Sequence, residues 1–216
     1  MKLTKPVVLL LSGGIDSTVV LAQLHKKAIP VHALSFNYGQ RHSVELEFAK
    51  RNAQKYAVAQ HHIIAPDYKA MQQGNLLTDL SFTPKNYLEE ALPRGINDCY
   101  VPGRNLLMLS YAAAYAEAHG LTDIYFAANA DDALRFPDCS TTFISTLQAL
   151  WQSCPNTQNI ILQTPLLKYN KTQVIQNALA LEIPLNDTIS CYSPEEDLEC
   201  GSCLSCIVKQ NAIAQL

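Results

Sequence analysis

The stretch PVVLLLSGGIDST, residues 6–18, decides the fold of this chain. Its apolar half, Pro6–Leu11, predicts a buried parallel strand that other elements cover on both faces. Gly13 and Gly14 then permit a tight turn, and the apolar spacing of Thr18–Lys27 predicts a helix. A glycine-rich turn between a buried strand and a helix N-terminus is typical of loops that bind phosphate groups.

The polar residues of this turn indicate how it would hold a phosphate. Backbone N–H groups and the hydroxyls of Ser12 and Ser17 would donate hydrogen bonds to an anion. Asp16 suits such a loop only together with a cation, and we expect Mg²⁺. The loop lacks the Gly-Lys-Ser/Thr of a Walker P-loop, and the alternative reading is a Gly-Gly turn with an ordinary helix cap.

Strands and helices alternate along the rest of the chain. Further strands are predicted at Val31–Phe36, His61–Ala65, Asp123–Ala127 and Ile160–Gln163, and further helices at Ser43–Ala57, Arg104–His119, Thr141–Trp151 and Lys171–Leu181. This alternation predicts an α/β fold, a doubly wound parallel sheet with helices on both faces. We expect the α/β domain to span residues 1–186. Residues 67–100 show no sustained period and are predicted to form a lid or mobile segment.

The composition excludes several classes of protein. The chain has 216 residues, of which 48% are hydrophobic and 16% charged, so it can fill a core. It contains no apolar run of about 18 residues, which excludes a membrane-spanning helix, and we expect a cytoplasmic protein. The net charge of −3 argues against direct binding of nucleic acid.

Four cysteines crowd the end of the sequence. Cys191, Cys200, Cys203 and Cys206 lie close together and include two CxxC steps. In a reducing compartment this clustering favours a metal over disulfides, and four thiolates would surround one Zn²⁺ tetrahedrally. Residues 187–216 are therefore predicted to form a small zinc-binding region, with an iron–sulfur cluster as the main alternative.

Three further polar clusters follow predicted strands or begin a helix. After the second strand, Gln40, Arg41 and His42 suit a carboxylate or a phosphate, or else form only a solvated loop. Arg104 begins a predicted helix, where the dipole disfavours a cation unless an anion lies beside it. The carboxylates of residues 128–138 would accept hydrogen bonds from a purine-like base, or would simply cap the next helix.

The string SGGIDST resembles the loop of the PP-loop ATP pyrophosphatases, which split ATP between its α- and β-phosphates. The chain as a whole resembles one family within them, the 7-cyano-7-deazaguanine synthases of queuosine biosynthesis. The matching stretches are SGGIDST (12–18), FNYGQRHS (36–43), VPGRN (101–105), FPDC (136–139), TPL (164–166), NK (170–171), SCY (190–192) and CGSCLSC (200–206). This resemblance implies an adenine-nucleotide alpha-hydrolase-like fold, one structural Zn²⁺ per chain and a homodimer.

The same resemblance implies an ATP-dependent C–N ligase. It would convert 7-carboxy-7-deazaguanine and ammonia to 7-cyano-7-deazaguanine through an adenylylated carboxylate and an amide, with Mg²⁺ accompanying ATP. The expected catalytic residues are Asp16, Ser17, Arg41 and Arg104. The expected ATP-binding residues are Leu11, Ser12, Gly13, Gly14, Ile15, Asp16, Ser17, Thr18, Gln40 and Arg104. The expected substrate-binding residues are Tyr38, His42, Asn129, Asp132, Phe136 and Asp138, with the N–H edge of the base facing Asp132 or Asp138.

Departures from the family pattern leave other functions open, at residues 207–212 after the last cysteine and at three positions between residues 133 and 140. Ala133 replaces an aromatic residue, Arg135 a glycine and Ser140 an arginine. One alternative is a divergent relative that stops at the amide or joins a deazaguanine-like acid to another amine. A second is a PP-loop enzyme that thiolates tRNA, which the negative net charge disfavours. A zinc-stabilised nucleotide-binding module without catalysis is the third.

Overall fold

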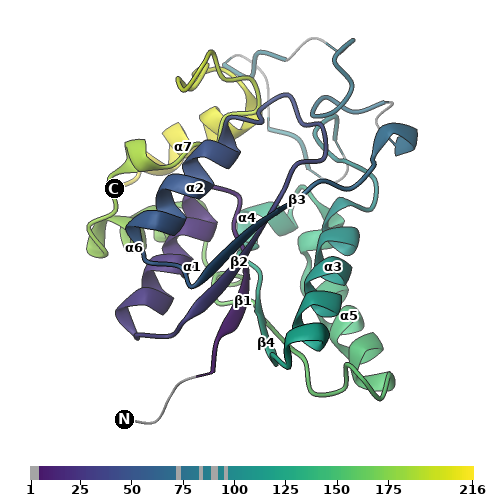
Figure 1. Ribbon diagram of the computed structural model, residues 1–216. Coiled ribbons are helices and arrows are strands. Elements are labelled where there is room, and N and C mark those ends of the chain that lie inside the picture. The colour runs from purple at the N-terminus through teal and green to yellow at the C-terminus, as the bar shows by residue number, and fades with distance from the viewer. Residues whose placement is uncertain (1–4, 72–73, 83–84, 89–91, 95–96) are drawn as a thin grey trace.

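The computed structural model describes residues 5–71, 74–82, 85–88, 92–94 and 97–216 (Figure 1). Its centre is a parallel five-stranded sheet in the order β3-β2-β1-β4-β5. The strands are β1 (Val7–Leu10), β2 (Val31–Phe36), β3 (Gln60–Ile64), β4 (Asp123–Tyr125) and β5 (Ile161–Gln163). The predicted α/β fold with a doubly wound parallel sheet is confirmed.

Helices cover both faces of the sheet. One face carries α1 (Ile15–Lys26), α2 (Glu45–Lys55), α6 (Lys171–Ala180) and α7 (Leu204–Ile213), and the other α3 (Arg104–His119) and α5 (Thr141–Ser153) (Figure 1). Alternate residues of β1 point to opposite faces, so Val8 and Leu10 join one apolar core while Val7 and Leu9 join the other. The continuous apolar run at the start of the chain therefore fills two cores.

Short elements follow the strands and connect the helices. They are α4 (Ala130–Ala133) and the 3₁₀ turns η1 (Lys69–Met71), η2 (Pro137–Cys139) and η3 (Leu185–Asp187). The helix α7 was not predicted, because the cysteine pattern of this segment was interpreted as a metal site alone. Its buried residues Leu204, Ile207 and Ala212 belong to the two sheet cores, so α7 joins the C-terminal segment to the main body.

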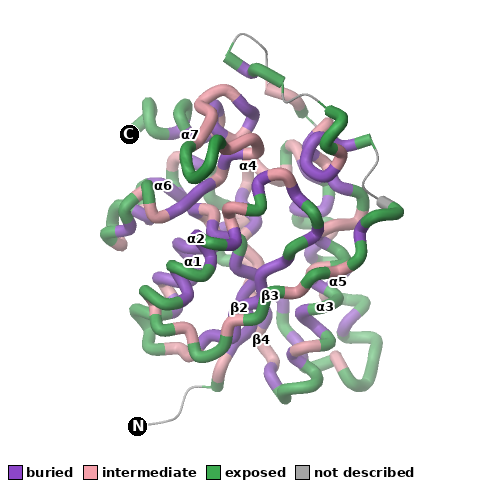
Figure 2. The backbone as a smooth tube through the Cα atoms, turned by 45° about the horizontal axis from the view of Figure 1, so that its top comes forward, coloured by how far each residue is buried: buried purple, intermediate pink, exposed green. Residues whose placement is uncertain are grey.

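Segment 67–100 is partly built into the core. Of its described residues, Tyr68, Leu76, Leu77, Tyr87 and Cys99 are buried in the α3-side core. Figure 2 colours the backbone by burial, with the sheet strands β1 and β2 largely buried at the centre. Residues 72–73, 83–84, 89–91 and 95–96 of this segment lie outside the described residues. A lid at this position stays a prediction. Within the described residues, no helix is both long and apolar enough to cross a bilayer.

Candidate active site

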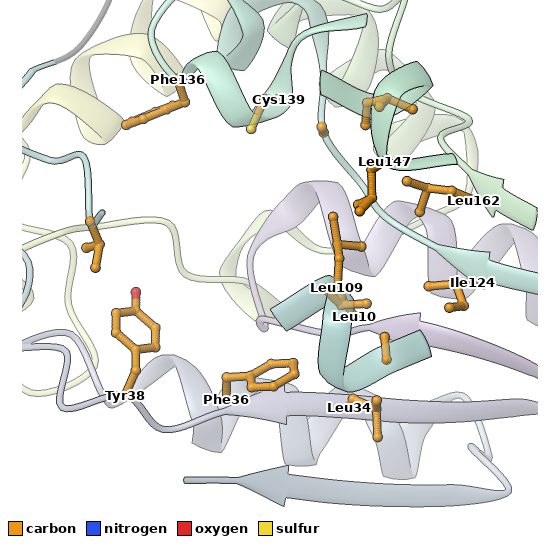
Figure 3. Close-up of a cluster of buried hydrophobic side chains, with 14 of the residues drawn as sticks. Leu10, Leu34, Phe36, Tyr38, Leu109, Ile124, Phe136, Cys139, Leu147 and Leu162 are labelled. Carbon is orange, nitrogen blue, oxygen red and sulfur yellow. The ribbon is translucent and has the colours of Figure 1, made fainter. Parts of the chain in front are cut away.

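A cavity of about 230 Å³ lies beyond the carboxyl ends of β1, β2 and β4, where parallel α/β sheets bind their ligands. Segments that are far apart in the sequence meet around it. Its lining includes Leu11, Ser12, Gly14, Asp16 and Ser17 after β1, Tyr38, His42 and Glu45 after β2, Arg104 and Asn105 of α3, Asp132, Phe136 and Cys139 after β4, and Ser190 and Tyr192 of the C-terminal segment. Figure 3 shows Phe36 and Tyr38 on one side of the neighbouring apolar cluster and Phe136 and Cys139 on the other.

The loop after β1 is held by its own hydroxyl groups. The Ser12 and Ser17 hydroxyls lie 3.1 Å apart, and the backbone N–H of Gly14 donates to Ser12 Oγ over 3.2 Å. Gly13 has φ +86°, and a Cβ there would stand 2.3 Å from the backbone oxygen of Glu45. The loop therefore presses against the start of α2, and only glycine fits at that point.

Asp16 is the centre of a half-buried charge cluster. Its Oδ1 accepts a hydrogen bond from Asn129 Nδ2 over 2.8 Å, and its Oδ2 lies 2.6 Å from Lys171 Nζ. Burial and the nearby charge of Asp16 raise the pKa of Asp132 to about 6. Burial opposes the charge of Lys171, but Asp16 and Asp132 outweigh it and raise the pKa of Lys171. The carboxylate of Asp16 is the kind of oxygen ligand that Mg²⁺ prefers, so this residue fits that ion.

Lys171 is a site residue that the sequence analysis missed. It lies in the first turn of α6, where the helix dipole disfavours a cation. A basic residue at the start of a predicted helix was the reason for choosing Arg104, and the same criterion selects Lys171. Lys171 is only 7% exposed, so its charge is directed into the protein toward Asp16.

Arg104 brings a guanidinium group to the opposite part of the cavity. Its Nη1 donates to the hydroxyl of Tyr38 over 3.1 Å, and its Cζ lies 5.6 Å from the centre of that ring. Among the described residues, no carboxylate lies within ion-pair distance of it. An enclosed guanidinium without an acidic partner is suited to an anionic ligand, which it can bind through two parallel hydrogen bonds.

Glu45 and His42 line the cavity near this guanidinium. Glu45 was not among the predicted site residues. Glu45 Oε1 accepts from Gln40 Nε2 over 2.9 Å and lies 3.6 Å from His42 Nε2. Burial raises the pKa of Glu45 to about 7. Burial, and then the charge of Arg104, lowers the pKa of His42 to about 3, so its imidazole is neutral at pH 7.

Several predicted site residues lie behind the cavity wall. Gln40 is buried and braces the loop, since its amide bonds Tyr38 N and Phe36 O in addition to Glu45. Arg41 turns away and donates from Nη2 to the carbonyl oxygens of residues 79 and 82. The remaining predicted residues that are absent from the lining are Gly13, Ile15, Thr18, Asn129 and Asp138.

Asp138 and Asn129 support the site from different positions. Asp138 is 7% exposed, and burial raises its pKa. Its Oδ1 has no hydrogen-bond partner among the described residues. Asn129 is fully buried and bonds two lining residues, since its Nδ2 donates to Asp16 and its Oδ1 accepts from the backbone N–H of Asp132. Asp132, in contrast, lines the cavity directly.

Two of these three departures from the family pattern, Ser140 and Arg135, have local structural uses. The Ser140 hydroxyl accepts from Phe143 N over 3.2 Å and so caps α5. Arg135 Nη1 donates to the carbonyl of Asp131 over 2.7 Å. Neither residue, nor Ala133, is among the described residues that line the cavity.

The four C-terminal cysteines come together as the spacing predicted. All four sulfur atoms lie within 4.8 Å of one another, and Sγ of Cys191 and Cys203 are 3.9 Å apart. A tetrahedral zinc ion with Zn–S bonds of about 2.3 Å places its sulfur ligands roughly 3.8 Å apart. The cluster could therefore hold one metal ion such as zinc, whereas an iron–sulfur cluster places its ligands on separate iron atoms, farther apart.

This cysteine cluster also shapes the cavity. The backbone N–H of Tyr192 donates to Cys203 Sγ over 3.4 Å, so a ligand sulfur fixes the position of a lining residue. The Tyr192 ring packs against His42, with ring centres 5.8 Å apart. Buried Phe48 of α2 packs against the same cysteines. The C-terminal segment that carries the four cysteines thus forms one wall of the cavity.

Comparison with known proteins agrees with the resemblance read from the sequence. The family model described as queuosine biosynthesis protein QueC matches residues 6–216. A 7-cyano-7-deazaguanine synthase of Rickettsia bellii is 38% identical, covering 96% of this chain and 93% of that protein. The one of Rickettsia felis is 39% identical over 96% of this chain and 94% of its own length.

Solved structures match the fold at lower identity. NMN synthetase from Francisella tularensis has a TM-score of 0.54 and 22% identity, over 94% of this chain and 71% of its own. NH3-dependent NAD synthetase from Campylobacter jejuni has a TM-score of 0.50 and 18% identity, over 85% of this chain and 67% of its own. At this identity the likeness establishes the fold alone.

Proposed function

This chain belongs to the family of the queuosine biosynthesis protein QueC, and from that premise we propose that it converts 7-carboxy-7-deazaguanine and ammonia to 7-cyano-7-deazaguanine at the expense of ATP. Its relatives are synthases, and it is an enzyme of the ATP-dependent ligase type. The observation that carries the proposal is the shared cavity. The glycine loop lines the same space as the Arg104 guanidinium, which has no carboxylate partner in the described part of the chain, so a nucleotide phosphate and an acid can meet there.

The proposed reaction activates the acid twice. A carboxylate oxygen attacks the α-phosphate of ATP, pyrophosphate leaves, and ammonia then displaces AMP to give the amide. In the second round the amide oxygen is adenylylated, and loss of AMP and of the nitrogen-bound protons gives the nitrile. Holding acid and phosphate in one site removes much of the entropic barrier to the first step.

The residues of the cavity suit this division of roles. Backbone N–H groups of the loop, with Ser12 and Ser17, would hold the phosphates, and Asp16 would hold Mg²⁺, which neutralises phosphate charge when bound. Arg104 would bind the carboxylate of the acid or the α-phosphate. Of the two carboxylates expected to read the N–H edge of the base, Asp132 is favoured because it lines the cavity. We assign Arg41 to anchoring residues 79–82.

The protein is also proposed to be a homodimer with a structural Zn²⁺ in each chain. Exposed apolar side chains gather on α3, and these are Leu106, Leu107 and Tyr111. A dimer would cover such a surface. Mass measured by light scattering and zinc measured by elemental analysis would test both statements.

Product analysis is the experiment that tests the reaction. The protein is incubated with carboxydeazaguanine, Mg·ATP and ammonium, and the products are identified by mass spectrometry. We expect the nitrile together with AMP and pyrophosphate. Amide without nitrile would favour the relative that stops at the amide, and no acid-dependent consumption of ATP would contradict the proposal. Asp16→Asn should abolish turnover, because an amide holds Mg²⁺ poorly and its single oxygen cannot accept from both Asn129 and Lys171.

A further inference from the structure

The carboxyl group of Glu45 lies in the cavity, and no step described above uses it. It begins α2, and its side chain is 15% exposed. Its Oε1 is engaged by Gln40, while no donor among the described residues reaches Oε2. Resting on the proposed function, we propose that Glu45 binds ammonium in this cavity and accepts the proton that ammonium must lose before its nitrogen attacks the adenylylated acid.

Glu45 is the acidic group in this part of the cavity that could bind a small cation. Arg104 of α3 and the hydroxyl of Tyr38 face it, and the nearby His42 is neutral at pH 7. Burial outweighs the charge of Arg104 and raises the pKa of Glu45 to about 7. A general base works best when its pKa is close to the working pH, since it is then both ionised and basic.

The Glu45 carboxyl and the Asp132 carboxyl, which was assigned to the deazaguanine ring of the substrate, lie on different segments of the lining. Asp132 follows β4 and pairs with the Asp16 cluster, whereas Glu45 begins α2 and bonds Gln40 of the loop after β2. Arg104, suited to an anion, is close enough to Glu45 to lower its pKa. An acid held by Arg104 therefore presents its carbonyl carbon near a carboxylate that can hold ammonium.

The proton and electron balance of the step is complete. Ammonium gives one proton to the Glu45 carboxylate and becomes ammonia. The nitrogen lone pair forms a bond to the acyl carbon, and the bond from that carbon to the AMP oxygen breaks with its electron pair on AMP. The nitrogen loses a second proton to the departing phosphate, leaving the neutral amide.

Glu45→Gln tests this role with little change to the fold. The glutamine oxygen can still accept from Gln40, but the side chain cannot take a proton. Glu47→Gln is the matched control on the same helix, because Glu47 is 57% exposed and its side chain pairs with exposed Lys50, outside the cavity. Hydroxylamine is the probe nucleophile, since it is largely unprotonated at pH 7 and needs no base to release its lone pair.

We expect Glu45→Gln to lower kcat/KM for ammonium about 100-fold or more, and to leave the rate with hydroxylamine within a few fold of wild type. Its acid-dependent exchange of pyrophosphate into ATP, which reports adenylylation alone, should be unchanged. The wild-type rate should level off above about pH 7. The variant's rate should instead keep rising with the concentration of free ammonia.

Other results would overturn the assignment. Equal losses with ammonium and hydroxylamine, or a raised KM for the acid, would show that Glu45 positions the acid or reads its base. Wild-type activity of Glu45→Gln with ammonium would show that it has no role. Absence of acid-dependent exchange in the wild type would instead remove the proposed function on which this inference depends.

Discussion

The loop after β1 and the pocket around Arg104 face each other across one cavity, but they are held in place by different means. The loop is fixed by bonds among residues 12–18 and by contact with the start of α2. The pocket joins side chains of α3, the β2–α2 loop and the C-terminal segment. A short motif can carry the first arrangement, whereas the second depends on how the whole chain packs.

Removing a metal ligand should break the pocket and spare the loop. In Cys203→Ser we expect loss of bound zinc and unfolding of the segment that carries Ser190 and Tyr192, because structural zinc is worth about 10–16 kcal/mol in isolated peptides. Zinc analysis and hydrogen exchange measure this. Exchange near Ser12 should stay slow, and the exposed Cys154→Ser should leave both properties as in wild type.

Replacing Gly13 should break the loop instead. Gly13→Ala combines φ +86° with a Cβ 2.3 Å from a backbone oxygen, so we expect a loss of about 3 kcal/mol of stability or more. Gly103→Ala is the control, because Gly103 has φ +65° but nothing within 4 Å, and about 1 kcal/mol is expected there. Urea unfolding compares the two. Equal losses would mean that only φ matters.

The charge cluster between the two regions should show in the pH dependence of stability. Because the pKa of Asp132 is raised from 3.8 to about 6, its contribution to stability is full below pH 3.8 and is lost as the pH rises through 6. Asp132→Asn should therefore be more stable than wild type above pH 6, by on the order of 1 kcal/mol. Urea titrations at a series of pH values test this, and a wild-type advantage at pH 8 would contradict it.

Arg104 should matter for activity and little for stability. Since its guanidinium has no carboxylate partner among the described residues, Arg104→Met should unfold within about 1 kcal/mol of wild type. Turnover should fall about 100-fold or more, because the bound anion loses its cation. A large loss of stability would show that Arg104 supports the fold instead.

Much of the fold could be predicted because its signals are local. The strand Val31–Phe36 and the helix Arg104–His119 have the predicted limits, since apolar periodicity sets them directly. The helix predicted from Ser43 begins at Glu45, because residues 41–44 form a turn. The helix Leu204–Ile213 was not predicted, since its cysteines were interpreted as a metal site alone.

The sequence by itself determined the strand and helix alternation, the glycine loop and the four-cysteine set, because each depends on residues that are neighbours in the chain. Only the tertiary structure decided which charged side chains meet. Arg41 and Arg104 looked equivalent in sequence, yet one binds loop carbonyls and the other faces the cavity. Likewise Lys171 pairs with Asp16, and Glu45 lies near Arg104, through contacts between segments that are far apart in the sequence. Burial and charge pairing depend on long-range packing, which no local pattern records.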